Sequence, residues 1–113
     1  MILAVVDDLF FRAKLETAAA QLGVPLTIVA DPISVPSGQL WSRVLIDLNL
    51  SRGDVLAMIR AIQAAHPGIP IVGFCSHVEQ QLQQQALAAG CTAVLPRSAF
   101  VQQLPQLLQS SAT

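Results

Sequence analysis

Short apolar runs alternate with helix-like segments along this chain of 113 residues. The runs are rich in β-branched residues, which is typical of buried strands, and apolar residues at helical spacing lie between most of them. We expect strands at 2–6, 26–29, 43–48, 69–74 and 93–95. We expect helices at 9–22, 53–65 and about 78–89, followed by a last helix with Ser98 as its N-cap. Strands that alternate with helices form parallel sheets, so the pattern predicts an α/β fold.

The expected architecture is a doubly wound, five-stranded parallel sheet of the flavodoxin-like type, with strand order 2-1-3-4-5. One connection departs from it, because residues 31–42 contain Pro32, Pro36 and Gly38, which disfavour a helix. We therefore expect the second helix to be reduced or absent. A chain of this size buries roughly 65% of its unfolded surface, so residues 1–113 are expected to form one domain.

Composition excludes several classes of function. The net charge is −1 and Lys and Arg do not cluster, so we expect no nucleic-acid partner. No apolar stretch approaches the ~20 residues that span a bilayer, and we expect no membrane association. Cys75 and Cys91 lack the spacing of a metal site and are expected to be buried free thiols. A cytoplasmic protein is the resulting expectation.

Acidic residues follow two of the predicted strands. Asp7 and Asp8 come directly after the first strand, and Asp47 lies at the end of the third, although the chain has only 7 acidic residues. In the expected strand order these two strands are neighbours, so the three carboxylates meet at one edge of the sheet. Such carboxylates repel one another unless a cation neutralises them, and Mg²⁺ accepts this kind of ligand. An aspartate there can also attack phosphorus and form an aspartyl phosphate.

Two further groups are expected at the same edge. Ser76 follows the fourth strand, and Arg97 follows the fifth. A hydroxyl group and a cation are suited to holding phosphoryl oxygens. The sequence therefore places an acceptor, metal ligands and phosphoryl-binding groups together.

These residues, in this order, resemble the receiver domain of bacterial two-component response regulators. The segment from Ile2 to Asp8 is similar to the first strand and acidic pair of that family, and Val44 to Asn49 is similar to the strand that carries its phosphoacceptor. The resemblance covers essentially the whole chain. It implies a receiver fold and a role in a phosphorelay.

The resemblance also implies roles for individual residues. Asp47 would accept a phosphoryl group from a sensor histidine kinase or a phosphotransfer protein, and it would be one of the Mg²⁺ ligands. Asp8 would bind Mg²⁺ directly, Asp7 directly or through water, and the main-chain carbonyl of Asn49 would complete the protein ligands. Ser76 would contact the phosphoryl group.

The chain departs from the family pattern at several positions. Arg97 stands where the family has lysine, and the two side chains are not interchangeable, because a guanidinium is planar and forked. Ser98 replaces a usual proline, His77 replaces a small residue, and Val94 replaces an aromatic switch residue. These changes affect the parts that transmit the phosphorylation signal more than the parts that bind metal and phosphate.

Three functional hypotheses follow. The first is a stand-alone receiver-like signalling protein, phosphorylated on Asp47 with Mg²⁺, that docks to a downstream effector protein. The alternative is a pseudo-receiver that acts as a phosphorylation-independent interaction or homodimerisation module. A small Mg²⁺-dependent phosphatase ranks last, because the chain offers no cap or substrate loop. We expect no enzyme activity beyond slow self-directed phosphoryl transfer.

Three local expectations concern packing. Trp41 is expected in the core, and one of the adjacent residues Phe10 and Phe11 is expected to be exposed, since neighbouring helical residues point about 100° apart. Pro105 is expected to kink or restart the last helix.

Overall fold

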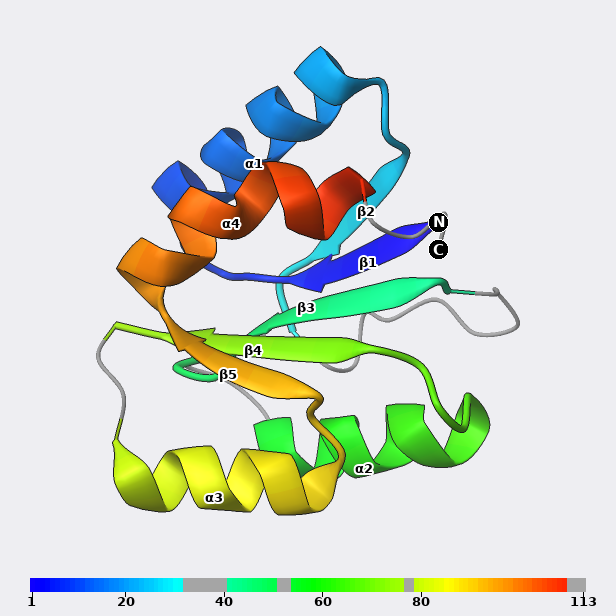
Figure 1. Ribbon diagram of the computed structural model, residues 1–113, viewed down its shortest axis with the longest axis vertical. Helices are drawn as coiled ribbons and strands as arrows, with labels where there is room; N and C mark the ends of the chain where they lie inside the picture. Colours follow the sequence, from blue (N-terminus) through cyan, green and yellow to red (C-terminus); the bar gives the residue numbers. More distant parts are fainter. Residues whose placement is uncertain (32–40, 51–53, 77–78, 110–113) are drawn as a thin grey trace.

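The apolar runs of the sequence form five short strands in the computed structural model, which describes residues 1–31, 41–50, 54–76 and 79–109. The strands are β1 (Ile2–Val5), β2 (Leu26–Val29), β3 (Arg43–Asp47), β4 (Ile71–Cys75) and β5 (Ala93–Pro96). All pairings are parallel, and the order is β2-β1-β3-β4-β5 (Figure 1). The predicted flavodoxin-like topology is therefore confirmed.

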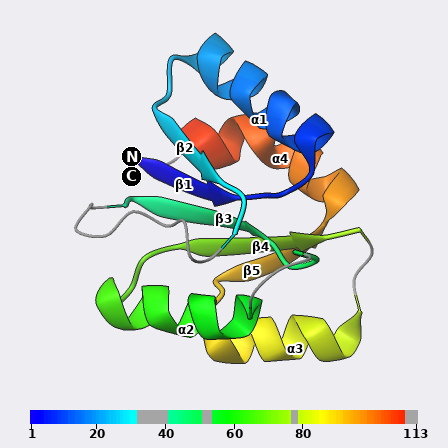
Figure 2. The same ribbon diagram turned by 180° about the vertical axis from the view of Figure 1, so that it is seen from behind.

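Four helices connect the strands in the described part of the chain. They are α1 (Leu9–Leu22), α2 (Val55–Ala65), α3 (Gln80–Ala89) and α4 (Arg97–Gln109). Helices α1 and α4 cover one face of the sheet, and α2 and α3 cover the other (Figures 1 and 2). The expected loss of a helix between β2 and β3 falls on residues 32–40, which lie outside the described residues.

Local sequence signals set the helix ends. The Asp8 and Asp54 side chains accept hydrogen bonds from main-chain N–H groups at the starts of α1 and α2. Helix α1 ends at Gly23, whose φ of 68° lies in the left-handed region that glycine adopts without a steric penalty. The apolar faces of the helices are thereby held over the sheet.

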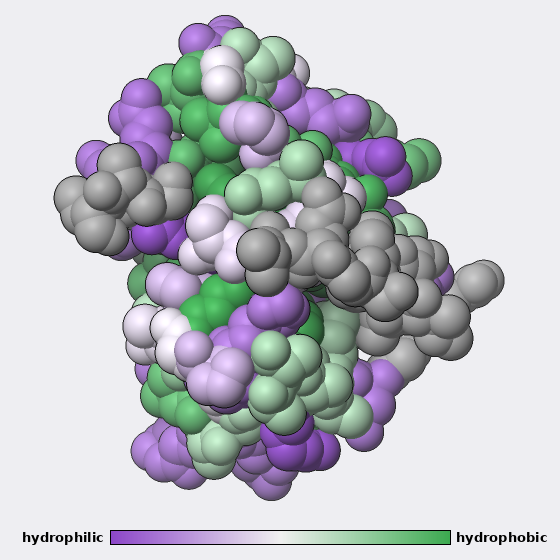
Figure 3. Space-filling model, turned by 90° about the vertical axis from the view of Figure 1, so that its right-hand side faces the viewer, coloured by the Kyte–Doolittle hydropathy of each residue, from purple (hydrophilic) through white to green (hydrophobic). Residues whose placement is uncertain are grey.

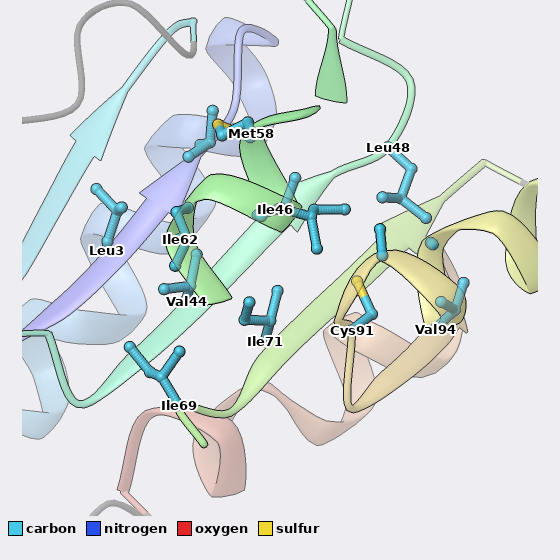
Figure 4. Packing of buried hydrophobic residues seen from close by; sticks show 14 of the residues in the cluster. Leu3, Val44, Ile46, Leu48, Met58, Ile62, Ile69, Ile71, Cys91 and Val94 are labelled. Atoms are coloured by element: carbon cyan, nitrogen blue, oxygen red, sulfur yellow. The ribbon is translucent and has the colours of Figure 1, made fainter. Parts of the chain in front are cut away.

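The sheet separates two hydrophobic clusters because successive strand residues point to opposite faces. Leu3, Val44 and Ile46 lie in the cluster beneath α2 and α3, which Figure 4 shows from close by. Ile2 and Leu45 lie in the cluster beneath α1 and α4. Strands covered on both faces have few polar positions, which explains the continuous apolar runs in the sequence.

The packing predictions are confirmed. Trp41 is buried, Phe11 is buried, and Phe10 is 91% exposed. Cys75 and Cys91 are buried free cysteines.

Two expectations concern the last helix. Strand β5 continues directly into α4 at Arg97, so Ser98 lies inside the first turn and the prediction that it is the N-cap is wrong. Pro105 lies inside α4, which extends to Gln109, so the predicted restart is wrong as well, while a kink at Pro105 stays a prediction.

None of the described helices has the length and apolar character needed to cross a membrane. On the side that holds the amino ends of the strands, hydrophilic and hydrophobic residues intermingle (Figure 3). In open parallel sheets, ligands bind at the carboxyl ends of the strands, which lie on the opposite side of this molecule.

Candidate functional site

The carboxyl ends of the parallel strands lie on the same side of the sheet, at the left in Figure 1. Asp8 follows β1, Asp47 ends β3, Ser76 follows β4 and Arg97 follows β5. Pairing of β1 with β3, β3 with β4 and β4 with β5 makes these ends neighbours. The structure thus brings the predicted site residues to one edge, as the sequence indicated.

Asp47 is the acid at the centre of this edge, with only 2% of its surface exposed. Its Oδ1 accepts a hydrogen bond of 2.8 Å from the main-chain N–H of Asn49, and its Oδ2 lies 3.6 Å from Arg97 Nη2. Burial raises the pKa of Asp47, and the nearby charges of Asp7 and Asp8 raise it further. The Asn49 N–H and Arg97 lower the pKa in part.

The Asp8 side chain caps the start of α1 and also contacts Arg97 in the site. Its Oδ1 accepts hydrogen bonds from the N–H groups of Phe10 (2.9 Å) and Phe11 (3.1 Å). Its Oδ2 lies 3.5 Å from Arg97 Nη1. The helix cap therefore fixes the carboxylate with one oxygen facing the site.

Arg97 bridges the two carboxylates with the two ends of its guanidinium group. Nη1 faces Asp8 and Nη2 faces Asp47, while the group lies 4.9 Å from the centre of the Phe11 ring. Such cation–π contact adds to the electrostatic attraction of the carboxylates. Arg97 Nε is buried without a hydrogen-bond partner.

Three stacked phenylalanines support Arg97 from the core. The ring of Phe11 lies 4.8 Å from that of Phe74, and Phe74 lies 4.2 Å from Phe100. These residues belong to α1, β4 and α4. The aromatic stack therefore ties the surface of the site to the core beneath α1 and α4.

Asn49 links the loop after β3 to the end of β4. Its Oδ1 accepts hydrogen bonds from the Ser76 N–H (3.0 Å) and the Ser76 hydroxyl (3.2 Å). Ser76 is exposed and lies at the edge of the site. Its hydroxyl is thus held close to the acceptor loop and donates to Asn49.

Comparison with known proteins identifies the fold. No protein-family model and no curated protein matches this chain. A Burkholderia pseudomallei response regulator with a phosphorylated aspartic acid and a calcium ion is 18% identical, with a TM-score of 0.82 over 98% of this chain and 67% of that one. A Vibrio cholerae chemotaxis response regulator is 18% identical, with a TM-score of 0.82 over 97% and 96% of the two chains. The fold is that of a response-regulator receiver domain.

A third receiver domain gives the highest identity of these three. It belongs to a sensor histidine kinase of Pseudomonas aeruginosa and has a magnesium ion in its active-site cleft. It is 28% identical to this chain, with a TM-score of 0.75 over 95% of each chain. The receiver fold thus extends over nearly the whole of the present sequence.

The acidic residues of the site are of the type that binds a divalent metal, but their side chains are not grouped as metal ligands are. Carboxylates of Asp7, Asp8 and Asp47 with a main-chain carbonyl of Asn49 are the oxygen ligands that Mg²⁺ and Ca²⁺ prefer. Among residues 1–31, 41–50, 54–76 and 79–109, however, no three His, Cys, Asp or Glu side chains are grouped so as to hold a metal. The Oδ2 atoms of Asp8 and Asp47 face the Arg97 guanidinium instead.

An open cleft of about 550 Å³ leads from the site of the receiver fold to the surface between α1 and α4. The residues that line it are Asp8, Phe10, Phe11, Lys14, Arg97, Ser98 and Val101.

Sequence reasoning missed two contributions to the site. The Phe11 ring supports Arg97, and the Asn49 side chain, not only its main chain, takes part through Ser76. The phenylalanine pair, one residue beyond the acidic pair, was a signal for the first. His77, which departs from the family pattern, lies outside the described residues.

Proposed function

We propose that this chain is a receiver-like signalling domain that accepts a phosphoryl group on Asp47. The observation that carries the proposal is the placement of Asp47: it ends the central strand β3, is buried, and has one oxygen held by Asn49 while the other faces a cation. This arrangement orients a carboxylate as a nucleophile. The phosphorylated aspartic acid of the Burkholderia response regulator, which shares the fold, supports the proposal.

The proposed step is a transfer to Asp47 Oδ2. A bond forms between Oδ2 and phosphorus, the bond between phosphorus and the donor's leaving atom breaks, and the leaving group keeps the electron pair and takes up a proton. Arg97 and the Ser76 hydroxyl are the groups placed to hold the phosphoryl oxygens. Burial of Asp47 keeps bulk water from the resulting acyl phosphate.

Asp7, Asp8, Asp47 and the main-chain carbonyl of Asn49 would hold a divalent ion, with Mg²⁺ as the proposed cofactor. When bound, the ion supplies charge neutralisation for the phosphoryl group. The magnesium in the active-site cleft of the Pseudomonas receiver domain supports this assignment.

The proposed partners are those that such chemistry requires. A sensor histidine kinase or phosphotransfer protein would donate the phosphoryl group, and an effector protein would read the phosphorylated state. In this role residues 1–113 act as one receiver domain in the cytoplasm.

A small phosphodonor tests the proposal. We would incubate the protein with Mg²⁺ and acetyl phosphate and measure the intact mass. One phosphoryl adduct is expected on the wild type and none on Asp47→Asn. Asp54→Asn is the matched control, because Asn replaces the Asp54 N-cap of α2 without touching the site. Absence of an adduct on the wild type, or its persistence on Asp47→Asn, contradicts the proposal.

A second function is favoured by the Arg97 bridge. A guanidinium bound to Asp8 and Asp47 occupies the acceptor without any phosphoryl group, which suits a pseudo-receiver that binds its partner constitutively. The same protein would then bind that partner equally before and after exposure to phosphodonor, and no adduct would form. An adduct at Asp47 excludes this second function as the only role.

A further inference from the structure

We propose that the cleft between α1 and α4 binds a small aromatic acid, with the ring of the ligand against apolar side chains and its anionic group at Lys14. This site lies beside the Asp47 pocket, and its occupation does not require phosphorylation of Asp47. Three features of the cleft carry the assignment: its size, its exposed aromatic ring and its unbalanced positive charge.

The cleft has the size and the lining of a small-molecule site. Its volume is about 550 Å³, and such sites usually measure about 300–1,000 Å³ and combine apolar walls with a few polar groups. Helices α1 and α4, which lie side by side in Figures 1 and 2, form its walls. Phe10 and Lys14 belong to α1, and Ser98 and Val101 belong to α4. Because residues three or four positions apart share one face of a helix, each wall presents one apolar and one polar side chain.

The apolar part of the cleft is largely aromatic. Phe10 is 91% exposed, so nearly all of its ring is in contact with water and is available to a ligand. The Phe11 side chain also lines the cleft, although its ring is buried against Phe74 and the Arg97 guanidinium. A flat ring placed between Phe10 and Val101 would cover apolar surface on both helices. It would also gain from ring–ring contact, which an aliphatic chain does not offer.

Two of the charged groups that line the cleft already balance each other. Asp8 Oδ2 lies 3.5 Å from Arg97 Nη1, and Asp8 Oδ1 accepts hydrogen bonds from the N–H groups that begin α1. The other end of the Arg97 guanidinium faces Asp47. Neither Asp8 nor Arg97 therefore contributes a free charge to the cleft.

The remaining charge of the cleft is that of Lys14. In the described part of the chain no carboxylate pairs with Lys14, whereas Arg12 on the same helix pairs with Glu16. An anionic group in the cleft would meet this ammonium group without competition from a carboxylate of the protein. The Ser98 hydroxyl on the facing wall supplies a second donor. The charge of the cleft thus favours an acid over a neutral or basic ligand.

Three probes separate the contributions of the ring and the charge. We would titrate nitrogen-labelled protein with naphthoate, with uncharged naphthylmethanol and with the aliphatic acid hexanoate, and follow the main-chain amides by NMR. Naphthoate is expected to bind with a dissociation constant of about 1 mM or less, an ordinary affinity for a ligand of its size. The largest shifts are expected at Phe10, Lys14, Ser98 and Val101. The other two probes are expected to bind at least about threefold more weakly, since each lacks one of the two contacts.

Variants assign the two contacts to residues. Lys14→Gln is expected to weaken naphthoate binding by about fivefold and to leave naphthylmethanol binding unchanged, because only the ion pair is lost. Phe10→Ala is expected to weaken both. Both side chains are exposed, so neither substitution disturbs the core. Arg12→Gln removes the same charge from α1 outside the cleft, and Leu87→Ala removes an exposed apolar side chain from α3; both are expected to match the wild type.

Several results would overturn this assignment. They are the absence of saturable naphthoate binding, amide shifts centred elsewhere, equal binding of naphthoate and naphthylmethanol, and an equal loss of affinity in Lys14→Gln and Arg12→Gln. Sedimentation of the same samples tests another occupant: a dimer that Phe10→Ala dissociates would place a second copy of the chain in the cleft, and this too overturns the assignment. None of these measurements uses a phosphodonor, so their outcome is separate from that of the Asp47 adduct.

Discussion

At the scale of single residues, the Asn49 side chain connects two loops of the site that the sequence does not visibly relate. Its Oδ1 accepts both the N–H and the hydroxyl of Ser76, while its own N–H is donated to Asp47. The side chain and the main chain of Asn49 therefore have separable effects. A side-chain substitution removes the contacts to Ser76 and leaves the N–H and carbonyl in place.

We predict that Asn49→Ala lowers the free energy of unfolding by about 1 kcal/mol, the usual net contribution of exposed hydrogen bonds of this kind. Urea unfolding measures the change. Ser76→Ala is predicted to cost less, since it removes only the hydroxyl bond. The two substitutions share a contact, so their effects in the double variant should not add. Strict additivity would show that the contact does not stabilise the protein.

Cys91 supplies a prediction for alkaline pH. Burial is the main cause that raises its pKa from 9.0 to about 11, and a hydrogen bond from the Gly73 main chain lowers it only in part. The thiolate therefore forms more readily in the unfolded chain. The stabilisation is fully present below pH 9 and is lost as pH rises through about 11.

In Cys91→Ala this loss should be smaller by about 3 kcal/mol, because the pKa of Cys91 rises from 9.0 to about 11 and each pKa unit corresponds to about 1.4 kcal/mol. Denaturant unfolding across this pH range measures the difference. An identical pH dependence in wild type and Cys91→Ala would contradict the assignment.

At the scale of elements, α4 contains the least expected feature. Pro105 lies within the helix and on its exposed side. Proline there cannot donate a hydrogen bond to the carbonyl of Val101, four residues earlier. The apolar residues Phe100, Leu104 and Leu108 nevertheless lie buried against the sheet, and this packing keeps α4 helical despite the proline.

We predict that Pro105→Ala raises the free energy of unfolding by about 1–2 kcal/mol. The gain from better helix propensity, up to about 3 kcal/mol, is reduced by the larger entropy of the unfolded chain. Chemical denaturation measures it, with Gln106→Ala as a matched exposed control on the same helix. A destabilised Pro105→Ala would mean that the proline fits α4 better than a helical alanine.

Much of the arrangement of the elements could be predicted from the sequence. The strand order and the meeting of Asp8, Asp47, Ser76 and Arg97 followed from apolar periodicity, because the carboxyl ends of parallel strands must share an edge. Ser98 was misplaced because β5 enters α4 without the intervening residue that a cap requires. The Arg97 bridge could not be predicted, since it depends on side-chain positions contributed by β3, by α1 with its cap and by α4 together.

At the scale of the whole molecule, two clusters share one sheet. Trp41 belongs to the cluster beneath α2 and α3, and Phe100 belongs to the cluster beneath α1 and α4. Each strand contributes to both clusters through its alternating residues. Loss of packing on one face is therefore expected to weaken the other.

We predict that Phe100→Ala lowers the free energy of unfolding by about 3–5 kcal/mol, because Phe100 is fully buried and stacked on Phe74. Trp41 fluorescence and far-UV circular dichroism should report the same lowered midpoint, although Trp41 lies across the sheet. Leu87→Ala, at a residue 42% exposed, should change stability by less than about 0.5 kcal/mol. Separate transitions for the two probes would show that the faces unfold independently.

The strand order also has a consequence for biosynthesis. Strand β1 precedes both of its neighbours along the chain, and it pairs with β2 on one edge and β3 on the other. Until the ribosome has made residues 43–47, the entirely buried segment Ile2–Val5 has an open edge and uncovered apolar side chains. Parallel pairing across such separations forms slowly and leaves nascent chains prone to aggregation. The strand that supports the acidic pair is thus the one most in need of protection while the protein is being synthesised.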